Sequence, residues 1–333
     1  MVPLYKKINE KLECQVCPHF CKLSAGHTGI CGVRKNTGEK IDLITYNVVS
    51  GYAVDPVEKK PLYHFFPGQR ILSIGSYGCN MRCDFCQNYN ISQNVPNSIV
   101  PDISVKKIIE DALFTENNIG VAFTYNEPIV WFEFMRDIAM AAKKEGLSCV
   151  MVSNGFVNPG VLDEIINFID AFNIDLKAFN NTFYRNLTGA ELEPVKLSLK
   201  KISEAGKHLE VTTLIIPGQN DSETEMSEQT EWMANELGQD TPFHLSRYFP
   251  TYKRSEPSTS EDSLKVLSEI ASKKLDYVYV GNSTSTTRHN TLCPVCSTIV
   301  TVRSGYQTKV MNLDEEGKCV NCGNQIYKNF IFS

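Results

Sequence analysis

The sequence predicts an α/β fold: a partial (βα)6 TIM-like barrel between an N-terminal Cys-rich segment and a C-terminal zinc-ribbon-like module. Short apolar runs alternate with helix-like segments through the middle of the chain, which indicates right-handed crossovers and a parallel sheet or barrel. The runs lack clean period-two alternation, as do parallel strands covered on both faces. Cysteines grouped in fours lie before and after this region, and they predict the two flanking modules.

Six apolar runs are the expected strands. Six strand–helix units fall short of the eight of a complete barrel, so we expect a partial barrel, with a doubly wound open sheet as the alternative. In either arrangement the active site lies at the carboxyl ends of the strands. The expected strands are 70–75, 119–124, 147–152, 170–176, 209–216 and 242–246.

Helix-like segments separate these runs. Ser104 is a suitable N-cap for the first of them, whose apolar residues recur with a helical period. Pro128 suits a first helical turn directly after the second strand. The expected helices are 104–117, 128–145, 159–168, 193–205 and 223–237.

Composition and charge narrow the class of protein. A net charge of −5 provides no basic field, so nucleic acid is not indicated as a partner. No stretch approaches about 18 uninterrupted apolar residues, and the start of the chain lacks the apolar core of a signal peptide, so we expect no membrane span and a cytoplasmic protein. The Ser/Thr-rich stretch 281–290 indicates a linker. We expect an N-terminal Cys-rich metal-binding segment at 1–69, a barrel at 70–285 and a ribbon-like module at 286–333.

The twelve cysteines fall into groups. In a reducing compartment such a number favours metal ligation over disulfides. Cys149 stands alone in an apolar run and is expected to be a small buried hydrophobic residue. The others form an N-terminal quartet (Cys14, Cys17, Cys21, Cys31), a cluster loop at residues 79–86 (Cys79, Cys83, Cys86) and a C-terminal quartet (Cys293, Cys296, Cys319, Cys322).

The cluster loop is the most informative motif. Cys79, Cys83 and Cys86 have the spacing Cys-x3-Cys-x2-Cys, which suits three corners of a [4Fe-4S] cubane, and no fourth cysteine follows in the loop. Electron-transfer clusters normally take four thiolates, so three ligands indicate an iron left open for another molecule. The competing interpretation is a zinc knuckle or three core thiols, but zinc sites usually pair two Cys-x2-Cys hooks.

The spacing, the aromatic Phe85 before the last cysteine and the position after the strand 70–75 resemble the radical S-adenosylmethionine (SAM) enzymes. The resemblance implies a radical SAM type of barrel, with the methionyl amine and carboxylate of SAM bound to the open iron. It also implies that the reduced cluster cleaves SAM to a 5′-deoxyadenosyl radical, the cofactor carrying the difficult chemistry.

Polar residues at the ends of strands two and three are candidate SAM contacts. In the run TYNEP, Glu127 resembles the acidic residue of the superfamily's Gly-Gly-Glu motif, which accepts the SAM ammonium, and Asn126 replaces the glycine before it. The alternative for Glu127 is a carboxylate that stabilises a helix N-terminus. In the run VSNGF, Ser153 and Asn154 are short polar residues suited to ribose hydroxyls, although such a motif alone is typical of a turn.

Two further strand ends carry charges. Asp175 and Lys177 end strand four, where desolvated charges need partners, and they resemble the Asp-Leu-Lys beside the SAM carboxylate in glycyl-radical activating enzymes. The alternative is a salt bridge at the barrel rim. After strand six, a histidine contacts SAM in those enzymes, whereas here Phe249 occupies the matching place and Arg247 is the candidate polar contact.

The two quartets predict metal modules. Two Cys-x2-Cys hooks separated by 22 residues make the C-terminal quartet a zinc ribbon, with iron in a rubredoxin-like site as the alternative. The N-terminal quartet fits either zinc or an auxiliary iron–sulfur cluster, and the softness of its ligands does not separate the two.

Together with DPVEKKPLYHFFPG (55–68), these motifs resemble the radical SAM enzymes of the AmmeMemoRadiSam system over almost the whole chain. That family is similar to the pyruvate formate-lyase activating enzymes. The resemblance implies Memo-like and Ammecr-like proteins as partners and an electron donor such as flavodoxin or ferredoxin. We therefore expect hydrogen abstraction from an unidentified substrate, with a glycyl-radical enzyme activase and a non-catalytic metal-binding redox scaffold as the alternatives.

Overall fold

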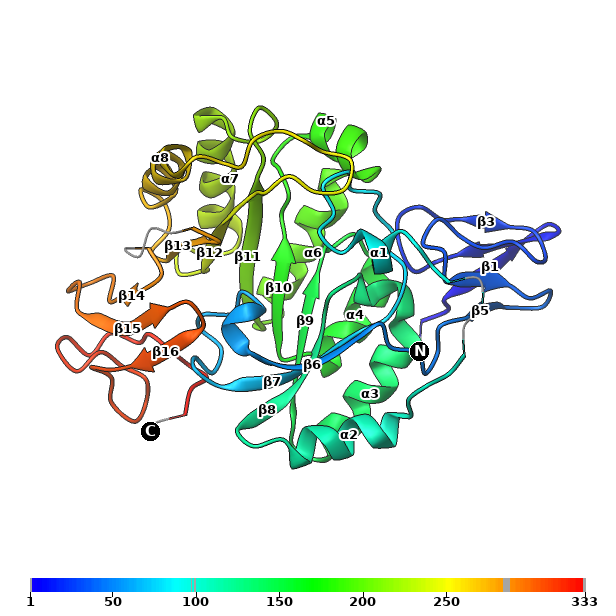
Figure 1. The fold of residues 1–333 in the computed structure, drawn as a ribbon, viewed down its shortest axis with the longest axis horizontal. Coiled ribbons are helices and arrows are strands. Elements are labelled where there is room, and N and C mark those ends of the chain that lie inside the picture. Colours follow the sequence, from blue (N-terminus) through cyan, green and yellow to red (C-terminus); the bar gives the residue numbers. More distant parts are fainter. Residues whose placement is uncertain (1, 97, 99, 284–287, 332–333) are drawn as a thin grey trace.

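An eight-stranded sheet forms the centre of the computed structural model, which describes residues 2–96, 98, 100–283 and 288–331 (Figure 1). The strands lie in the order β13-β12-β11-β10-β9-β8-β7-β6. Strands β7 to β13 are parallel, and β6 runs antiparallel to β7 at one edge. The bounds are β6 (Gly51–Pro56), β7 (Arg70–Gly75), β8 (Asn118–Phe123), β9 (Ser148–Ser153), β10 (Ala171–Asp175), β11 (His208–Ile215), β12 (Phe243–Arg247) and β13 (Val278–Gly281).

The strand order decides between the two expected architectures. A doubly wound sheet reverses its order at a switch point, whereas here each strand lies beside its neighbour in sequence. This is the winding of a barrel, and within the described residues the edge strands β6 and β13 do not pair, so the barrel is open. The α/β fold with a parallel sheet is confirmed.

Each of the six expected strands, β7 to β12, is present and is followed by a helix, and the parallel part of the sheet has a seventh strand that was not expected. The additional strand β13 has only four residues, and its evidence is its pairing with β12, from Phe243↔Val278 to Ser246↔Gly281. Gly281 also belongs to the expected linker 281–290, of which residues 284–287 lie outside the described residues. The antiparallel strand β6 was not expected either.

The expected helices are confirmed with small shifts of their ends. Ser104 caps the first of them, since its Oγ accepts a hydrogen bond from Lys107 N at 3.2 Å. Pro128 begins a 3₁₀ turn that leads into the second helix. The helix α8 was not expected. The bounds are α2 (Val105–Phe114), η2 (Pro128–Trp131), α3 (Phe132–Lys144), α4 (Pro159–Phe168), α6 (Leu192–Glu204), α7 (Glu223–Glu236) and α8 (Glu261–Ala271).

The main core lies between the sheet and these helices. Neighbouring helices pack in sequence order, α2 on α3, α3 on α4, α4 on α6 and α7 on α8. Ile74, Phe123, Trp131 and Val195 are among the fully buried side chains of this core. Burial of each such side chain contributes about 1.5–3 kcal/mol, so the core fixes the strands whose carboxyl ends form the site.

A segment at residues 57–68, here called the inner segment, is anchored to the sheet by Glu210 of β11. The buried Glu210 carboxylate accepts hydrogen bonds from Tyr63 N (3.0 Å) and His64 N (2.7 Å). It also bonds to His244 Nε2 at 2.6 Å. Burial favours the neutral acid, but hydrogen bonds from neighbouring histidines hold the pKa of Glu210 below its usual range. His244 therefore has a structural role in this network.

The C-terminal module docks on the inner segment through Arg303. Its guanidinium lies 4.1 Å from the centre of the Tyr63 ring and donates hydrogen bonds to Tyr63 O and Thr291 Oγ1, each at 2.8 Å. Arg303 is buried. The module contains a three-stranded antiparallel sheet, β14 (Thr291–Leu292), β15 (Ile299–Ser304) and β16 (Gln307–Val310).

The remaining elements are short. Across the described parts of the chain, no helix is both long enough and apolar enough to cross a membrane. The N-terminal region contains two small antiparallel sheets, and four short helical turns lie in the connections. Their bounds are β1 (Tyr5–Ile8), β2 (Lys11–Cys14), β3 (Lys22–Leu23), β4 (Arg34–Asn36), β5 (Ile41–Leu43), η1 (Val57–Lys59), α1 (Tyr89–Ser92), α5 (Asn181–Phe183) and η3 (Tyr184–Thr188).

Candidate active site and metal centres

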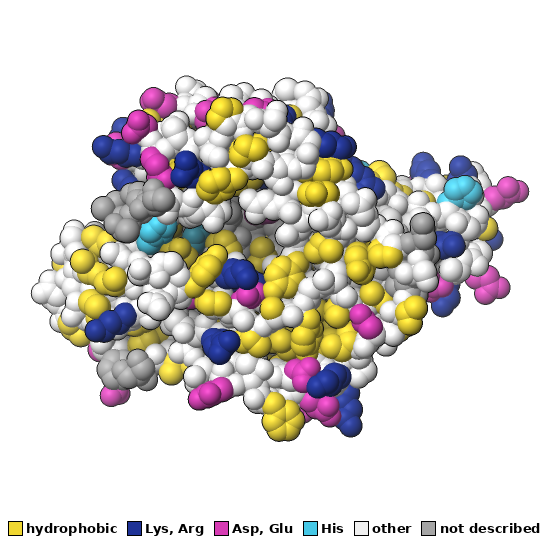
Figure 2. Space-filling model, viewed as in Figure 1, with side chains coloured by type: hydrophobic (Ala, Val, Ile, Leu, Met, Phe, Trp, Pro, Cys, Tyr) yellow, Lys and Arg dark blue, Asp and Glu magenta, His cyan; other side chains and the backbone are white. Residues whose placement is uncertain are grey.

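The cluster loop follows β7, at the carboxyl edge of the parallel sheet. Figure 2 shows the molecule in the orientation of Figure 1. The face that it draws has a hollow near its middle, with hydrophobic side chains around the hollow. Asn126, after β8, braces the backbone that leads into the loop. Its Oδ1 accepts from Ser76 N at 3.0 Å, and its Nδ2 donates to Gly78 O at 2.8 Å. Asn126 thus couples the end of β8 to the loop that follows the neighbouring strand β7.

The three cysteines of the loop are free thiols, and Cys83 is buried. Burial raises the pKa of Cys79, and the negative charges of Glu127, Cys83 and Cys86 raise it further. The three sulfurs do not crowd as ligands of a single ion do, since they are absent from the one group of described ligand atoms that all lie within 4.8 Å. A cubane suits this wider spacing, because each thiolate binds a different iron.

Glu127 is a buried carboxylate held by three donors. Its Oε1 accepts from Ile129 N (3.1 Å) and Ser153 Oγ (2.8 Å), and its Oε2 accepts from Asn154 N (2.8 Å). The bond to Ile129 N caps η2, so the helix N-terminus alternative describes part of its environment. Burial raises the pKa of Glu127 to about 7. A carboxylate in this position favours a cationic partner.

Ser153 ends β9 and Asn154 follows it, and both contact Glu127, while Asn154 also contacts the cluster loop. Besides the bonds to Glu127, Asn154 Nδ2 donates to Asn80 Oδ1 at 2.9 Å and lies 3.7 Å from Cys79 Sγ. Asn80 is buried, and its Nδ2 donates to Phe156 O at 2.7 Å. Sequence reasoning missed Asn80, since only its position between two cysteines of a motif distinguished it.

Asp175 and Lys177 form an ion pair at the end of β10, with Lys177 Nζ 2.8 Å from Asp175 Oδ2. Lys177 Nζ lies 5.9 Å from the centre of the Phe85 ring. Burial raises the pKa of Cys83 to about 12, and Lys177 opposes that rise. The pair is therefore the expected rim salt bridge, and the structure also brings it to the cluster loop.

Arg247 is held by other partners. Its Nε donates to Thr259 O at 2.8 Å, and its Nη1 donates to Glu261 Oε1 at 2.9 Å. Its guanidinium also lies 5.2 Å from the centre of the Phe249 ring. These contacts tie the end of β12 to α8, and the described interactions of Arg247 include none of the residues around the cluster loop.

A second buried charge network lies under the end of β8, and sequence reasoning missed it. Lys60 Nζ bonds to Asp55 Oδ2 at 2.7 Å, and Tyr125 Oη donates to the same carboxylate oxygen at 2.7 Å. Lys60 is buried and lies 4.6 Å from the centre of the Tyr125 ring. Tyr125 has a φ of +69°, so the residue directly before Asn126 is held in a left-handed conformation.

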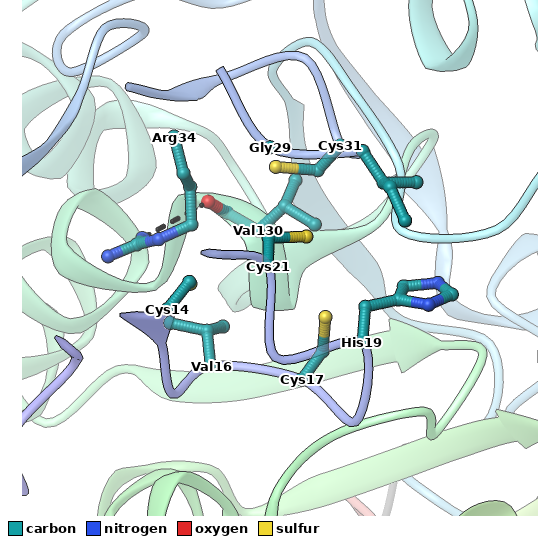
Figure 3. A pocket seen from close by; sticks show the side chains of 10 residues that line it. Cys14, Val16, Cys17, His19, Cys21, Gly29, Cys31, Arg34 and Val130 are labelled. Atoms are coloured by element: carbon teal, nitrogen blue, oxygen red, sulfur yellow. Dashed lines mark hydrogen bonds between the residues drawn. The ribbon is translucent and has the colours of Figure 1, made fainter. Parts of the chain in front are cut away.

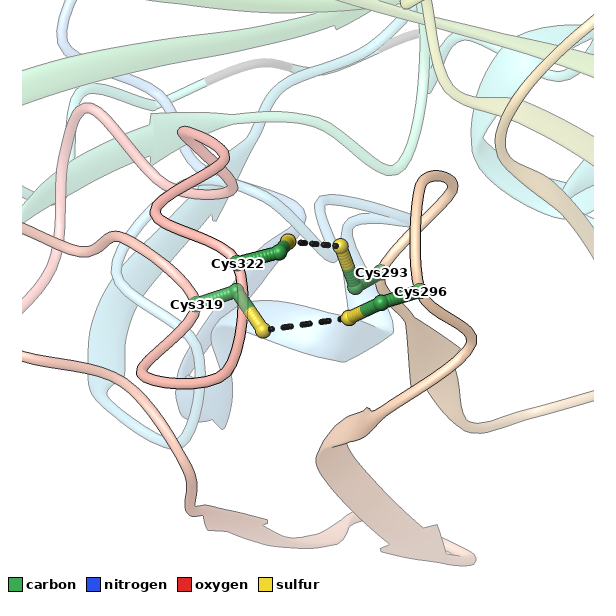
Figure 4. Close-up of side chains that lie close together, drawn as sticks. All are labelled: Cys293, Cys296, Cys319 and Cys322. Atoms are coloured by element: carbon green, nitrogen blue, oxygen red, sulfur yellow. Dashed lines mark hydrogen bonds between the residues drawn. The ribbon is translucent and has the colours of Figure 1, made fainter.

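The C-terminal quartet has the geometry of a single-ion site. All four sulfurs lie within 4.8 Å of one another, with Cys293 Sγ 3.4 Å from Cys322 Sγ and Cys296 Sγ 3.6 Å from Cys319 Sγ (Figure 4). A tetrahedral zinc site with Zn–S bonds of about 2.3 Å places its sulfurs about 3.8 Å apart. The quartet therefore fits one tetrahedral metal ion.

The N-terminal quartet also converges on one cavity. Cys14, Cys17, Cys21 and Cys31 line it, together with residues that include Arg34 (Figure 3). Unlike those of the C-terminal quartet, these described sulfurs do not all lie within 4.8 Å of one another.

Comparisons with known proteins agree with this site. The profile of the radical SAM superfamily matches residues 73–229. Uncharacterized protein MJ0808 of Methanocaldococcus jannaschii is 37% identical over 327 residues, which cover 97% of each chain. Pyruvate formate-lyase 1-activating enzyme of Escherichia coli K12 is 28% identical over 176 residues, or 51% of this chain and 71% of that one.

The solved structures show the same fold. The crystal structure of a radical SAM methyltransferase from Sphaerobacter thermophilus matches with a TM-score of 0.51 at 13% identity, over 66% of this chain and 68% of that one. The sequence match to the superfamily, the open parallel barrel and the loop of three free cysteines agree with one another. The chain is an enzyme that belongs to the radical SAM superfamily, with homology to the pyruvate formate-lyase activating enzymes.

Proposed function

We propose that Cys79, Cys83 and Cys86 hold a [4Fe-4S] cluster whose remaining iron binds SAM. The observation that carries the proposal is a loop of three free, spaced thiols without a fourth cysteine, directly after the first parallel strand. When bound, the cluster and SAM supply a 5′-deoxyadenosyl radical that abstracts hydrogen from a substrate. The protein supplies the position of the loop, through Asn126, and a carboxylate beside it.

Glu127 is the residue we assign to the SAM amine, as the acceptor of a hydrogen bond from its N–H. It is buried, burial raises its pKa to about 7, and three neutral donors leave part of its hydrogen-bonding capacity free. Ser153 and Asn154 hold this carboxylate in place and lie toward the ribose side in our assignment. A hydrogen bond from the SAM amine occupies the acceptor capacity that Glu127 has left, which is a physical reason for SAM to bind here.

Asp175, Lys177 and Phe85 form the other side of the proposed SAM pocket. The ion pair lies beside Cys83, so a charged group of SAM can meet a residue of opposite charge there. Phe85 supports this arrangement by packing against Phe183, with 5.8 Å between the ring centres. Arg247 is a weaker candidate, because Thr259 and Glu261 already engage its guanidinium.

The AmmeMemoRadiSam group is the proposed family within the superfamily. The proposal rests on the resemblance of the motifs over almost the whole chain, and the match of MJ0808 to 97% of the chain indicates that the barrel and its flanking parts also occur together in another protein. We propose Memo-like and Ammecr-like proteins as partners and a flavodoxin or ferredoxin as the electron donor, in a cytoplasmic setting. In this assignment the C-terminal quartet binds structural zinc, since its sulfurs already lie at the spacing of a tetrahedral ion.

A glycyl-radical activase is the second candidate function. It is favoured by the 28% identity to pyruvate formate-lyase 1-activating enzyme. The activase predicts a stable protein radical, detected by electron paramagnetic resonance (EPR), on a partner protein encoded nearby. Membership of an enzyme superfamily sets aside the non-catalytic scaffold.

The test is an anaerobic reconstitution followed by addition of SAM and dithionite, with 5′-deoxyadenosine measured by chromatography. We expect product from the native chain and none from Cys83→Ala. The matched control is Cys149→Ala, because this buried thiol packs against Ala139 O, away from the cluster loop. A native chain with an intact cluster that forms no 5′-deoxyadenosine would contradict the proposal.

A further inference from the structure

The four cysteines of the N-terminal quartet lie at the end of β2 and in the two connections that follow it. Cys14 ends β2, Cys17 and Cys21 lie in the connection to β3, and Cys31 lies shortly before β4. Cys14 N donates to Cys21 O at 2.9 Å, which closes the first connection on itself. Three of the four thiols are buried, and Figure 3 shows the sulfurs of Cys17, Cys21 and Cys31 around one space. Four free thiols gathered around one cavity indicate ligands of a common centre.

The spacing of the sulfurs distinguishes a site for a single metal ion from a site for a cluster of several. The C-terminal quartet of the same chain meets the spacing of a single tetrahedral ion, with all ligand atoms within 4.8 Å. Neither the N-terminal quartet nor the cluster loop does, although both are described in full. An iron–sulfur cluster spreads its thiolates over different irons, so it needs a wider set of sulfurs than zinc does.

Arg34 supplies an independent observation. It is 2% exposed and lines the cavity, and its two terminal nitrogens each bond to Glu133 of α3 at 2.7 Å. Its Nε is buried and has no hydrogen-bond partner among the described residues. A buried donor without a partner is destabilising, because it loses its hydrogen bond to water and gains none in the protein. Such a donor at the wall of a cavity lined by thiols favours an anionic acceptor inside it, and Arg34 lies close enough to Cys14 and Cys31 for their charges to raise its pKa.

We propose that Cys14, Cys17, Cys21 and Cys31 bind a second, polynuclear iron–sulfur cluster, with Arg34 Nε as a hydrogen-bond donor to its sulfur. Four thiolates complete the protein ligands of a [2Fe-2S] or [4Fe-4S] cluster, so this centre has no position open for SAM. It is therefore of the electron-transfer type, in contrast to the centre at the cluster loop.

The proposed centre lies against the cluster loop. His19 Nε2 bonds to Asn80 O at 2.7 Å. A Cβ on Gly78 would lie 2.4 Å from Cys31 O, so the two backbones are in direct contact there, and the positive φ of 86° is open to glycine. A one-electron centre in this place is adjacent to the loop that binds the SAM cluster, a consequence that rests on the proposed function.

Metal analysis of a variant without the cluster loop tests the site. In the full chain, Cys79→Ala, Cys83→Ala and Cys86→Ala together remove the SAM cluster and leave the N-terminal quartet intact. After anaerobic reconstitution we expect about two to four iron atoms per chain, about as much acid-labile sulfide, and an EPR signal on reduction that SAM does not change. Adding Cys149→Ala to this variant is the control and should change none of these values.

Two outcomes would overturn the proposal: a second equivalent of zinc without sulfide, or no iron in the variant. Because this variant cannot cleave SAM in any case, its metal content is independent of the proposed activity. If the variant binds no iron, the proposal of a SAM cluster is unaffected. If the native chain lacks the SAM cluster, the N-terminal centre can still be tested in this variant.

Arg34→Met in the same background tests the hydrogen bond. Loss of the positive charge and of the donor stabilises the oxidised centre, so the reduction potential should shift to a more negative value at unchanged iron content. Lys35→Met, on the same strand, is the matched control and should leave the potential unchanged. An unaltered potential in Arg34→Met refutes the role of Arg34, and if this variant fails to fold, Arg34→Gln is measured in its place.

Discussion

Replacing Glu127 by Gln removes a buried charge while keeping the shape of the side chain. In the native chain the carboxylate accepts from Ile129 N, Ser153 Oγ and Asn154 N at 2.8–3.1 Å and, in our assignment, from the N–H of the SAM amine. A hydrogen bond to a charged group contributes about 1.5–3 kcal/mol, so its loss should raise the Kd of SAM about 10- to 100-fold.

The pH dependence gives the same prediction a second readout. Burial raises the pKa of Glu127 from 4.5 to about 7, so without SAM the protonated form is the more stable one in the fold. Its contribution to the free energy of unfolding is present below about pH 4.5 and is lost as the pH rises through about 7. SAM binds to the carboxylate form of Glu127, and an amine that coordinates iron has given up its extra proton, so the Kd of SAM should fall as the pH rises through about 7.

The assay is anaerobic equilibrium dialysis with labelled SAM, with each protein adjusted to the same iron content. Glu228→Gln, an exposed change on α7, is the matched control and should bind SAM as the native chain does. Native affinity in Glu127→Gln, or the same pH profile as the native chain, would refute the assignment of this carboxylate to SAM.

Three further changes test the loop, the pocket and the C-terminal module. Asn126→Ala removes the brace on the cluster loop, so less iron should stay bound after desalting, and native iron content would argue against the brace. Asp175→Asn leaves Lys177 without its ionic partner and should weaken SAM binding about tenfold, or about 1.4 kcal/mol; an unchanged Kd by dialysis would contradict the pocket. Cys319→Ala should lose about one equivalent of metal by mass spectrometry and lower the Tm of the chain, because metal ligation folds such small modules, and full retention of the metal would count against the zinc assignment.

Local sequence patterns predicted much of the fold. The six apolar runs became β7 to β12, and Ser104 and Pro128 marked the starts of helical segments, because both signals arise within a few residues. The shortest parallel strand, β13, gave too few residues for such a signal. Strand β6 was missed because its place in the sheet depends on pairing with β7, from Gly51↔Gly75 to Pro56↔Arg70.

The candidate site was predictable where the parallel sheet itself gathers residues. Glu127 follows β8 and Ser153 ends the neighbouring strand β9, so their contact at 2.8 Å comes from the shared carboxyl edge. Arg34 and Glu133 are joined across 99 positions of sequence, and no local pattern pairs them. Asn80 likewise shows its role only through contacts with Asn154 and Phe156 O.

The coordination of SAM to an open iron is the claim on which the rest depends. Electron–nuclear double resonance of the reduced native chain, with SAM labelled with ¹⁵N at its amine, measures that coordination directly. We predict a coupling from the labelled nitrogen, which disappears in Cys83→Ala. A fully assembled cluster at the loop that shows no coupling to the labelled amine would contradict the account.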